Sequence, residues 1–230
     1  MTEAQDPLHI PQNDRDDEST AKIIQRVVAP GTIAVDVGAN IGDVTNEMVK
    51  AAPDAPHIAV EPIPGLAAHV RGRFPHISVH EVALAAQEGP DVEFHHVVTN
   101  PSYSGLRERR YDRPDEKVEL IRVRTTTLDA IVPEDAVVSM VKIDVEGGEL
   151  GVLQGGSRVL SRRPVVVFEH GLGAADHYGT EPGVIHDLMW GHGLRISSLN
   201  GYLAFEPSYS RDEFEYQFYS GTRWMFVAHP

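Results

Sequence analysis

The chain has 230 residues, with 20 basic against 34 acidic side chains and a net charge of −14. This length suits one α/β domain with a sizeable core, and the negative charge disfavours binding to nucleic acid or anionic membranes. Cysteine is absent, which excludes disulfides and a cysteine nucleophile, and neither a signal peptide nor a membrane span is visible, so we expect a cytoplasmic protein.

The first 19 residues are predicted to form a flexible acidic tail ahead of one domain, residues 20–230. They contain six acidic side chains against a single arginine, and few large apolar groups that could be buried. The alternative is a lid, or an arm of a homodimer, that is ordered by contact. Apolar residues then recur at helical spacing over 21–28, which predicts a short amphipathic helix.

An apolar run at 33–37 leads into a turn with glycines at Gly38 and Gly42. Glycine lets the backbone turn sharply and lets a ligand approach the backbone N–H groups closely. The spacing is not that of a dinucleotide-binding turn, because Asn40 lies where the pattern Gly-x-Gly-x-x-Gly is interrupted. Asp36 and Asp43 would repel a pyrophosphate but suit a positively charged ligand, such as S-adenosylmethionine (SAM).

A second apolar run, 57–61, ends in Glu61, 23 positions after Gly38. In doubly wound sheets an acidic residue at this place accepts hydrogen bonds from both ribose hydroxyls of the ligand. Strands alternate with helices in this part of the chain, which predicts parallel strands with crossover helices. The further elements expected are helices over about 42–51 and 64–72 and a strand over 77–82.

Two extended runs, 92–96 and 118–125, interrupt this alternation after the third strand. We interpret them as an inserted antiparallel β-hairpin that hangs over the cofactor pocket. The loop between them carries a basic cluster, which could hold an anionic small molecule but is more often only solvated. The cluster consists of Arg107, Arg109, Arg110 and Arg113.

The second half of the chain resumes the alternation and closes with an antiparallel pair. We expect strands over 137–143 and 164–168, helices over 148–155 and 182–192 and a short helix starting at 127–129. The closing extended segments are 194–198, 202–205 and 223–228. The fold class is therefore α/β, doubly wound and mostly parallel.

Five blocks resemble, in order, the motifs of the FkbM family of SAM-dependent methyltransferases. They are Val35-Asp-Val-Gly-Ala-Asn-Ile-Gly-Asp43, Val60-Glu-Pro62, Thr127-Leu-Asp129, Val141-Lys-Ile-Asp-Val-Glu-Gly-Gly-Glu149 and Val165-Val-Val-Phe-Glu-His170. The resemblance covers about residues 25–228. It implies the class I methyltransferase fold, a Rossmann-like seven-stranded sheet, with SAM as cofactor. It also implies methyl transfer, most often to oxygen, but no particular acceptor. Our leading hypothesis is O-methylation of a small polar or secondary-metabolite acceptor.

The carboxyl ends of the strands should carry the site, because ligands of open α/β sheets bind there. Methyl transfer to oxygen needs a positioned acceptor and a base, and His170 is the first candidate base because neutral imidazole is available at pH 7. Glu169 could hold that imidazole or bind the acceptor, and Asp144 could face the methionine amino group or the acceptor hydroxyl. The predicted cofactor-binding residues are Asp36, Gly38, Asn40, Gly42, Asp43, Glu61, Ala83 and Asp144.

No metal site is predicted. Asp144, Glu146 and Glu149 offer hard oxygen ligands, but with Asp144 at a strand end and Glu149 inside the following helix only one or two should converge. The helix dipole is enough to explain two acids near a helix N-terminus. The competing functions are an N-methyltransferase acting on a small molecule, a nicotinamide-dependent oxidoreductase and a non-catalytic cofactor-binding protein.

Overall fold

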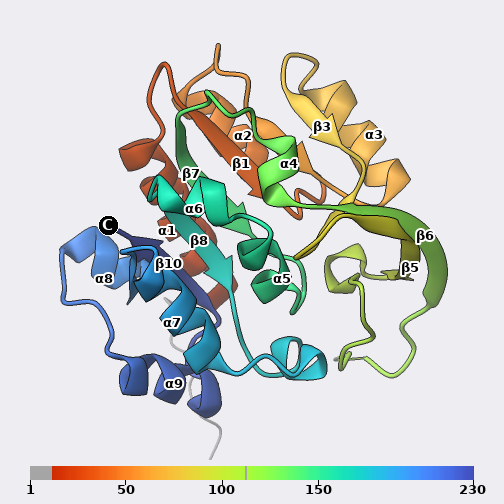
Figure 1. The fold of residues 1–230 in the computed structure, drawn as a ribbon. Helices are drawn as coiled ribbons and strands as arrows, with labels where there is room; N and C mark the ends of the chain where they lie inside the picture. Colours follow the sequence, from red (N-terminus) through yellow and green to blue (C-terminus); the bar gives the residue numbers. More distant parts are fainter. Residues whose placement is uncertain (1–11, 112) are drawn as a thin grey trace, which may run out of the picture.

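The computed structural model describes residues 12–111 and 113–230, which form a central sheet with helices on both faces (Figure 1). The sheet has seven strands in the order β3-β2-β1-β7-β8-β10-β9. Neighbours from β3 to β8 are parallel, whereas β10 is antiparallel to both β8 and β9. The strands are β1 (Ile33–Val37), β2 (Ile58–Val60), β3 (Ser78–His80), β7 (Val138–Ile143), β8 (Val165–Glu169), β9 (Arg195–Ser198) and β10 (Met225–His229). The predicted fold class is confirmed.

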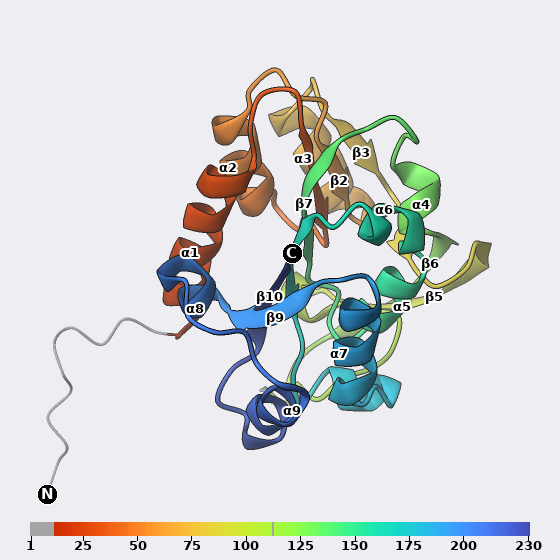
Figure 2. The same ribbon diagram turned by 60° about the vertical axis from the view of Figure 1, so that its left-hand side comes forward.

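Alternate residues of the buried strands face two separate layers of helices. In β1, Val35 and Val37 pack into one apolar cluster, while Ala34 packs into the other. Figure 2 shows α1, α2 and α8 on one side of the sheet and α5, α6 and α7 on the other. The first layer contains α1 (Gln12–Val27), α2 (Asp43–Ala51), α3 (Pro64–Arg73) and α8 (Leu199–Ala204), and the second contains α4 (Leu128–Ile131), α5 (Glu149–Gln154), α6 (Ser157–Ser161), α7 (Pro182–Gly191) and α9 (Arg211–Ser220).

The insertion forms a second sheet of three strands in the order β4-β6-β5. It consists of β4 (Ala83–Leu84), β5 (Gly89–Val97) and β6 (Val118–Thr126), and β5 pairs with β6 in antiparallel fashion. The predicted hairpin is therefore present. The loop between its strands begins with the short 3₁₀ helix η1 (Pro101–Tyr103).

Helix α1 begins earlier than expected. Residues 1–11 lie outside the described residues, but residues 12–19, which were predicted to belong to the flexible tail, form the first half of this helix. Ile23 and Ile24 are fully buried in the core and anchor it, and the Ser19 hydroxyl donates to the Asn200 side chain at 2.9 Å. The tail prediction counted large apolar side chains and therefore missed a helix that is held by its C-terminal half.

The C-terminal region also contains helices that were not expected. Residues 202–205, predicted as extended, lie mostly in α8, because the Ser198 hydroxyl caps that helix by accepting from the N–H of Gly201. Helix α9 begins with a capping box between Ser210 and Glu213. This spacing is visible in the sequence and could have predicted the helix. None of the helices in the described residues is long and apolar enough to cross a membrane.

Candidate active site

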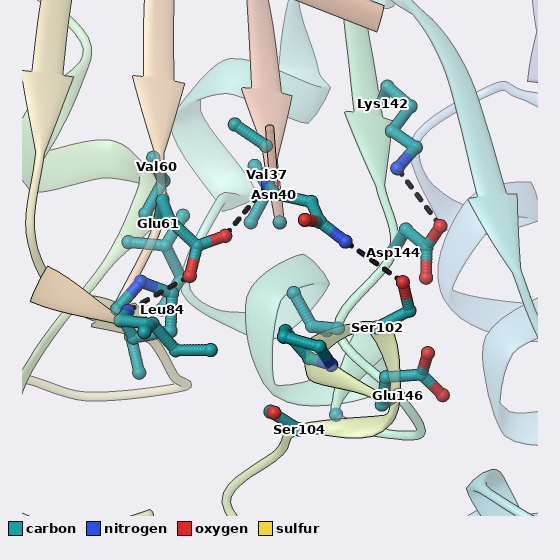
Figure 3. A pocket seen from close by; sticks show the side chains of 18 of the residues that line it. Val37, Asn40, Val60, Glu61, Leu84, Ser102, Ser104, Lys142, Asp144 and Glu146 are labelled. Carbon is teal, nitrogen blue, oxygen red and sulfur yellow. Dashed lines mark hydrogen bonds and ion pairs between the residues drawn. The ribbon is translucent and has the colours of Figure 1, made fainter. Parts of the chain in front are cut away.

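A cavity of about 350 Å³ opens at the carboxyl ends of β1, β2 and β7 (Figure 3). Cavities of this size are typical of small-molecule sites. The loops after these strands line one part of it, and the insertion lines another through Ser102 and Ser104. The predicted cofactor residues that line the cavity are Gly38, Asn40, Asp43, Glu61, Ala83 and Asp144.

Glu61 lies at the end of the cavity next to β2, and its carboxylate is held by two backbone groups. One oxygen accepts from the N–H of Asn40 at 2.8 Å and the other from the N–H of Ile63 at 2.9 Å. Burial raises the pKa of Glu61 to about 7. Each oxygen keeps a further lone pair, so the fixed carboxylate can accept hydrogen bonds from two ligand hydroxyls.

The backbone conformation of the turn requires glycine at both of its glycine positions. Gly38 has φ 83°, and a Cβ there would overlap the carbonyl of Asp144. Gly42 has φ 86° and lies against the ring of Phe74. The N–H of Gly38 donates to Val60 at 2.9 Å. The prediction that these glycines expose N–H groups to a ligand therefore finds no support, and Gly42 does not line the cavity.

Asp36 also lies away from the cavity. It is fully buried under α2, where its carboxylate accepts from the Thr45 hydroxyl at 2.6 Å. Its register partner on β7 is Lys142, whose positive charge partly offsets the rise in pKa that burial imposes on Asp36. Asp36 thus supports the neighbouring strand instead of contacting the pocket contents.

Charged side chains from three segments meet at the other end of the cavity. Asp144 follows β7 and accepts from Lys142 Nζ at 3.0 Å, as Figure 3 shows. Asp144, Glu146 and Glu169 each place a carboxylate oxygen within 4.8 Å of the others. Arg109 of the insertion forms an ion pair with Glu146. The insertion therefore joins this charged cluster, which is defined by these five residues.

The pKa values of Asp144 and Glu169 are shifted in opposite directions. Burial and the negative charge of Asp144 raise the pKa of Glu169 well above its usual range. Burial opposes ionisation of Asp144 as well, but the charge of Lys142 and a hydrogen bond from Glu169 outweigh it, so the pKa of Asp144 is lowered. The two shifts favour the protonated form of Glu169 and the ionised form of Asp144.

His170 does not lie where a general base is needed. Its side chain is 1% exposed and stacks between the rings of Phe218 and Phe214, with centroid distances of 4.7 and 6.1 Å. Neither ring nitrogen has a hydrogen-bond partner among the described residues, and burial lowers the pKa of His170 to about 4. Glu169 bonds to Asp144 and does not hold the imidazole. This placement contradicts the reasoning that led to His170.

The acidic residues after β7 have separate roles. Glu149 accepts from the N–H groups of Gly147 and Val145 at 3.0 and 3.3 Å and so supports the loop that carries Glu146. The sequence analysis considered Asp144, Glu146 and Glu149 and expected only one or two of them to converge. In the structure three carboxylates do converge, but the third is Glu169 from β8 and not Glu149. These carboxylates could hold a metal ion, but Lys142 and Arg109 already form ion pairs with two of them, which argues against a metal site.

Residues 36–196 match the methyltransferase FkbM domain. The match covers more than half of the chain. The chain belongs to the FkbM methyltransferase family. It is therefore a SAM-dependent methyltransferase, and the oxidoreductase interpretation is not supported. No curated protein matches the chain at a significant level.

Solved structures with a similar fold are distant in sequence. A protein from Clostridium thermocellum that carries the provisional name rRNA methylase has a TM-score of 0.51 at 9% identity, with 96% of each chain covered. A provisionally named methyltransferase from Streptococcus mutans, solved in complex with SAH, has a TM-score of 0.48 at 9% identity, covering 96% of this chain and 98% of that one. The precorrin-6y C5,15-methyltransferase from Geobacter metallireducens has a TM-score of 0.45 at 14% identity, covering 84% of this chain and 78% of that one.

The cavity of this FkbM methyltransferase suits SAM in its donor set. A carboxylate with free lone pairs, Glu61, suits the ribose, and the apolar side chains of Val82 and Leu84 line the wall beyond it. Charged groups of both signs, Lys142 and Asp144, lie at the opposite end of the cavity. When bound, SAM supplies a methyl group that is activated by its positively charged sulfur.

Proposed function

We propose that this FkbM methyltransferase transfers the methyl group to a hydroxyl of a small polar or secondary-metabolite acceptor, with Asp144 as the proton acceptor. The observation that carries the proposal is the position of the Asp144 carboxylate at the cavity wall, where it accepts from Lys142 Nζ at 3.0 Å. An acceptor hydroxyl attacks the methyl carbon while its proton passes to a base.

The neighbouring residues fit this role for Asp144. Lys142 holds one oxygen of Asp144 at 3.0 Å and keeps the carboxylate charged. The proton of the acceptor hydroxyl would pass to the Asp144 carboxylate as the C–S bond to the methyl group breaks and the new C–O bond forms. Arg109 of the insertion forms an ion pair with Glu146, whose carboxylate lies beside that of Asp144.

Oxygen is favoured over nitrogen by the negative charge of Asp144. A carboxylate in this place stabilises the ammonium form of an amine, which has no lone pair for attack. A hydroxyl needs only a hydrogen bond to the carboxylate and keeps its lone pairs. N-methylation is the alternative outcome.

A small molecule is favoured over RNA. The net charge of −14 opposes a phosphate backbone, and the insertion narrows the entrance with Ser102, which accepts from the Asn40 side chain at 2.9 Å. The rRNA substrate in the name of the Clostridium thermocellum protein belongs to that protein and does not identify the substrate of this chain. A chain without cysteine also suits the reducing cytoplasm as its place of action.

The test is methyl transfer from labelled SAM to a panel of sugars, hydroxylated secondary metabolites, amines and total RNA. We expect the label in an O-methyl ether of a small molecule, located by mass spectrometry and NMR. Label in RNA would overturn the small-molecule proposal, and label on nitrogen would overturn the assignment to oxygen.

A further inference from the structure

The insertion brings Arg109 to the charged cluster from a distant part of the chain. Its guanidinium forms an ion pair with Glu146, and the two side chains are only 14% and 11% exposed. Glu146 lines the cavity, on the same side as Asp144 (Figure 3). One carboxylate oxygen of Glu146 lies within 4.8 Å of one from Asp144 and one from Glu169. Arg109 therefore supplies a positive charge next to the proposed proton acceptor.

The position of Arg109 is fixed by the backbone on both sides of it. The N–H of Arg107 donates to the Tyr178 hydroxyl at 3.1 Å, and the N–H of Arg110 donates to the carbonyl of Gly173 at 3.3 Å. Both partners belong to the segment after β8. The loop that carries Arg109 is thus docked on the core, so little further ordering is needed to hold its guanidinium in place.

A ring of the insertion also supports the side chain. The guanidinium of Arg109 lies 4.6 Å from the centroid of the Tyr103 ring, a distance at which a cation is attracted by the face of an aromatic ring. The ion pair with Glu146 and this ring contact together define one orientation for the Arg109 side chain.

The balance of charge around Asp144 depends on Arg109. The groups that act on Asp144 are Asp36 on β1, Lys142 on β7, Glu146 in the loop after β7, Glu149 in α5, Glu169 at the end of β8 and Arg109 of the insertion. Within this set four carboxyl groups surround Asp144, against two cations. Without Arg109 the set would keep Lys142 as its one cation, and negative charge nearby favours the protonated form of a carboxyl group.

We infer that Arg109 is a positioning residue for the methyl transfer, which offsets the charge of Glu146 and so keeps Asp144 in the anionic form that can accept a proton. The inference rests on the proposed function, in which Asp144 takes the proton of the acceptor hydroxyl. Burial raises the pKa of Asp144, whereas the charge of Lys142 and, to a lesser extent, that of Arg109 lower it. The insertion thereby contributes to the reaction as well as to the cavity wall.

The experiment measures turnover against pH at saturating SAM, with the acceptor found in the panel. The wild-type rate should stay nearly level from about pH 8 to about pH 5, because the pKa of Asp144 is lowered. Arg109→Met should lose about threefold or more over this range, since removing a cation near a carboxylate raises the pKa of that carboxylate by about 1–3 units. Arg109→Gln should show the same loss, whereas Arg109→Lys, which keeps the charge, should follow the wild type.

A double variant tests the offset of charge directly. Arg109→Met combined with Glu146→Gln removes one charge of each sign, so most of the rate lost at about pH 5 should return. Arg110→Met is the matched control, because it removes the same charge from the next position, where the side chain is exposed. It should leave the pH profile unchanged. Calorimetry with S-adenosylhomocysteine shows which variants are folded and keep the cofactor site.

Two results would overturn the inference. One is a pH profile of folded Arg109→Met or Arg109→Gln that coincides with that of the wild type. The other is an equal loss of turnover at every pH, which would indicate that Arg109 has only a structural role. Wild-type turnover by Asp144→Asn would instead overturn the proposed function, so the two failures are distinguishable.

Discussion

The two ends of the cavity are built in different ways. At the cofactor end, Glu61 is held by two backbone N–H groups, and the nearby turn satisfies its own donors internally. The other end is where we propose that the acceptor binds. There Asp144 follows β7, Glu169 ends β8 and Arg109 belongs to the insertion, and Lys142 and Arg109 offset part of the negative charge. Cofactor binding thus depends on short motifs, whereas the acceptor chemistry depends on packing between distant segments.

The largest expected effect concerns the acceptor end. Asp144→Asn should lower turnover by about 10²- to 10⁴-fold, the usual contribution of a positioned proton acceptor, while the affinity for S-adenosylhomocysteine is retained. The measurement is steady-state methyl transfer to the acceptor found in the panel, combined with calorimetry.

His170→Leu is the matched control for this variant. It replaces a buried neutral ring without partners by an apolar side chain of similar size, so a folded variant should keep its turnover. A folded His170→Leu protein without activity, next to an active Asp144→Asn, would return the base to His170.

The next effect concerns the cofactor end. Glu61→Ala should weaken the binding of SAM by about 1.5–3 kcal/mol, or roughly 10- to 150-fold, since two ligand hydroxyls and two backbone donors lose their acceptor. Isothermal titration of the folded variant measures this loss, and Glu61→Gln, which keeps an oxygen, should lose less. An unchanged dissociation constant would remove Glu61 from the site.

A smaller effect is expected at the loop between the two ends, where burial raises the pKa of Glu149 to about 7 from an ordinary value of 4.5. The folded state therefore keeps a proton that the unfolded state has released, so stability falls as the pH rises from 4.5 through 7 and then levels off. Between about pH 5 and about pH 8 the wild type should lose about 1–3 kcal/mol more than Glu149→Gln.

Urea unfolding of the two proteins at both pH values checks this expectation. The other buried carboxyl groups are present in both proteins, so the difference reports Glu149 together with its electrostatic effect on Asp144 and Glu169. Equal pH dependence in the wild type and Glu149→Gln would show that Glu149 is ionised throughout and that the loop holds a charge.

The smallest effect is expected for metal removal. EDTA should change neither turnover nor cofactor affinity, because Lys142 and Arg109 already neutralise the carboxylates at the acceptor end. Loss of activity with EDTA and its recovery with magnesium would contradict this expectation and would show that the charged cluster binds a metal ion.

Strands, crossover helices and the cofactor end could be predicted because they depend on local signals. The run 33–37 is buried along its whole length, and its boundaries match those of β1. Glu61 was placed by its distance from Gly38 along one βαβ unit, whose geometry leaves little freedom. The antiparallel insertion followed from the pattern of two extended runs around a loop.

The sequence by itself determined the fold class, the family and the carboxylate at the second strand end, since each rests on residues close together in the chain. Only the tertiary structure decided which strand-end side chain faces the cavity. Successive residues of an extended strand point to opposite faces, so Glu169 meets Asp144 while His170 enters the core against Phe218. Asp17 of α1 also lines the cavity, and this could not be predicted from local composition. The packing of Ile23 and Ile24 in the core determines where the first turns of α1 lie.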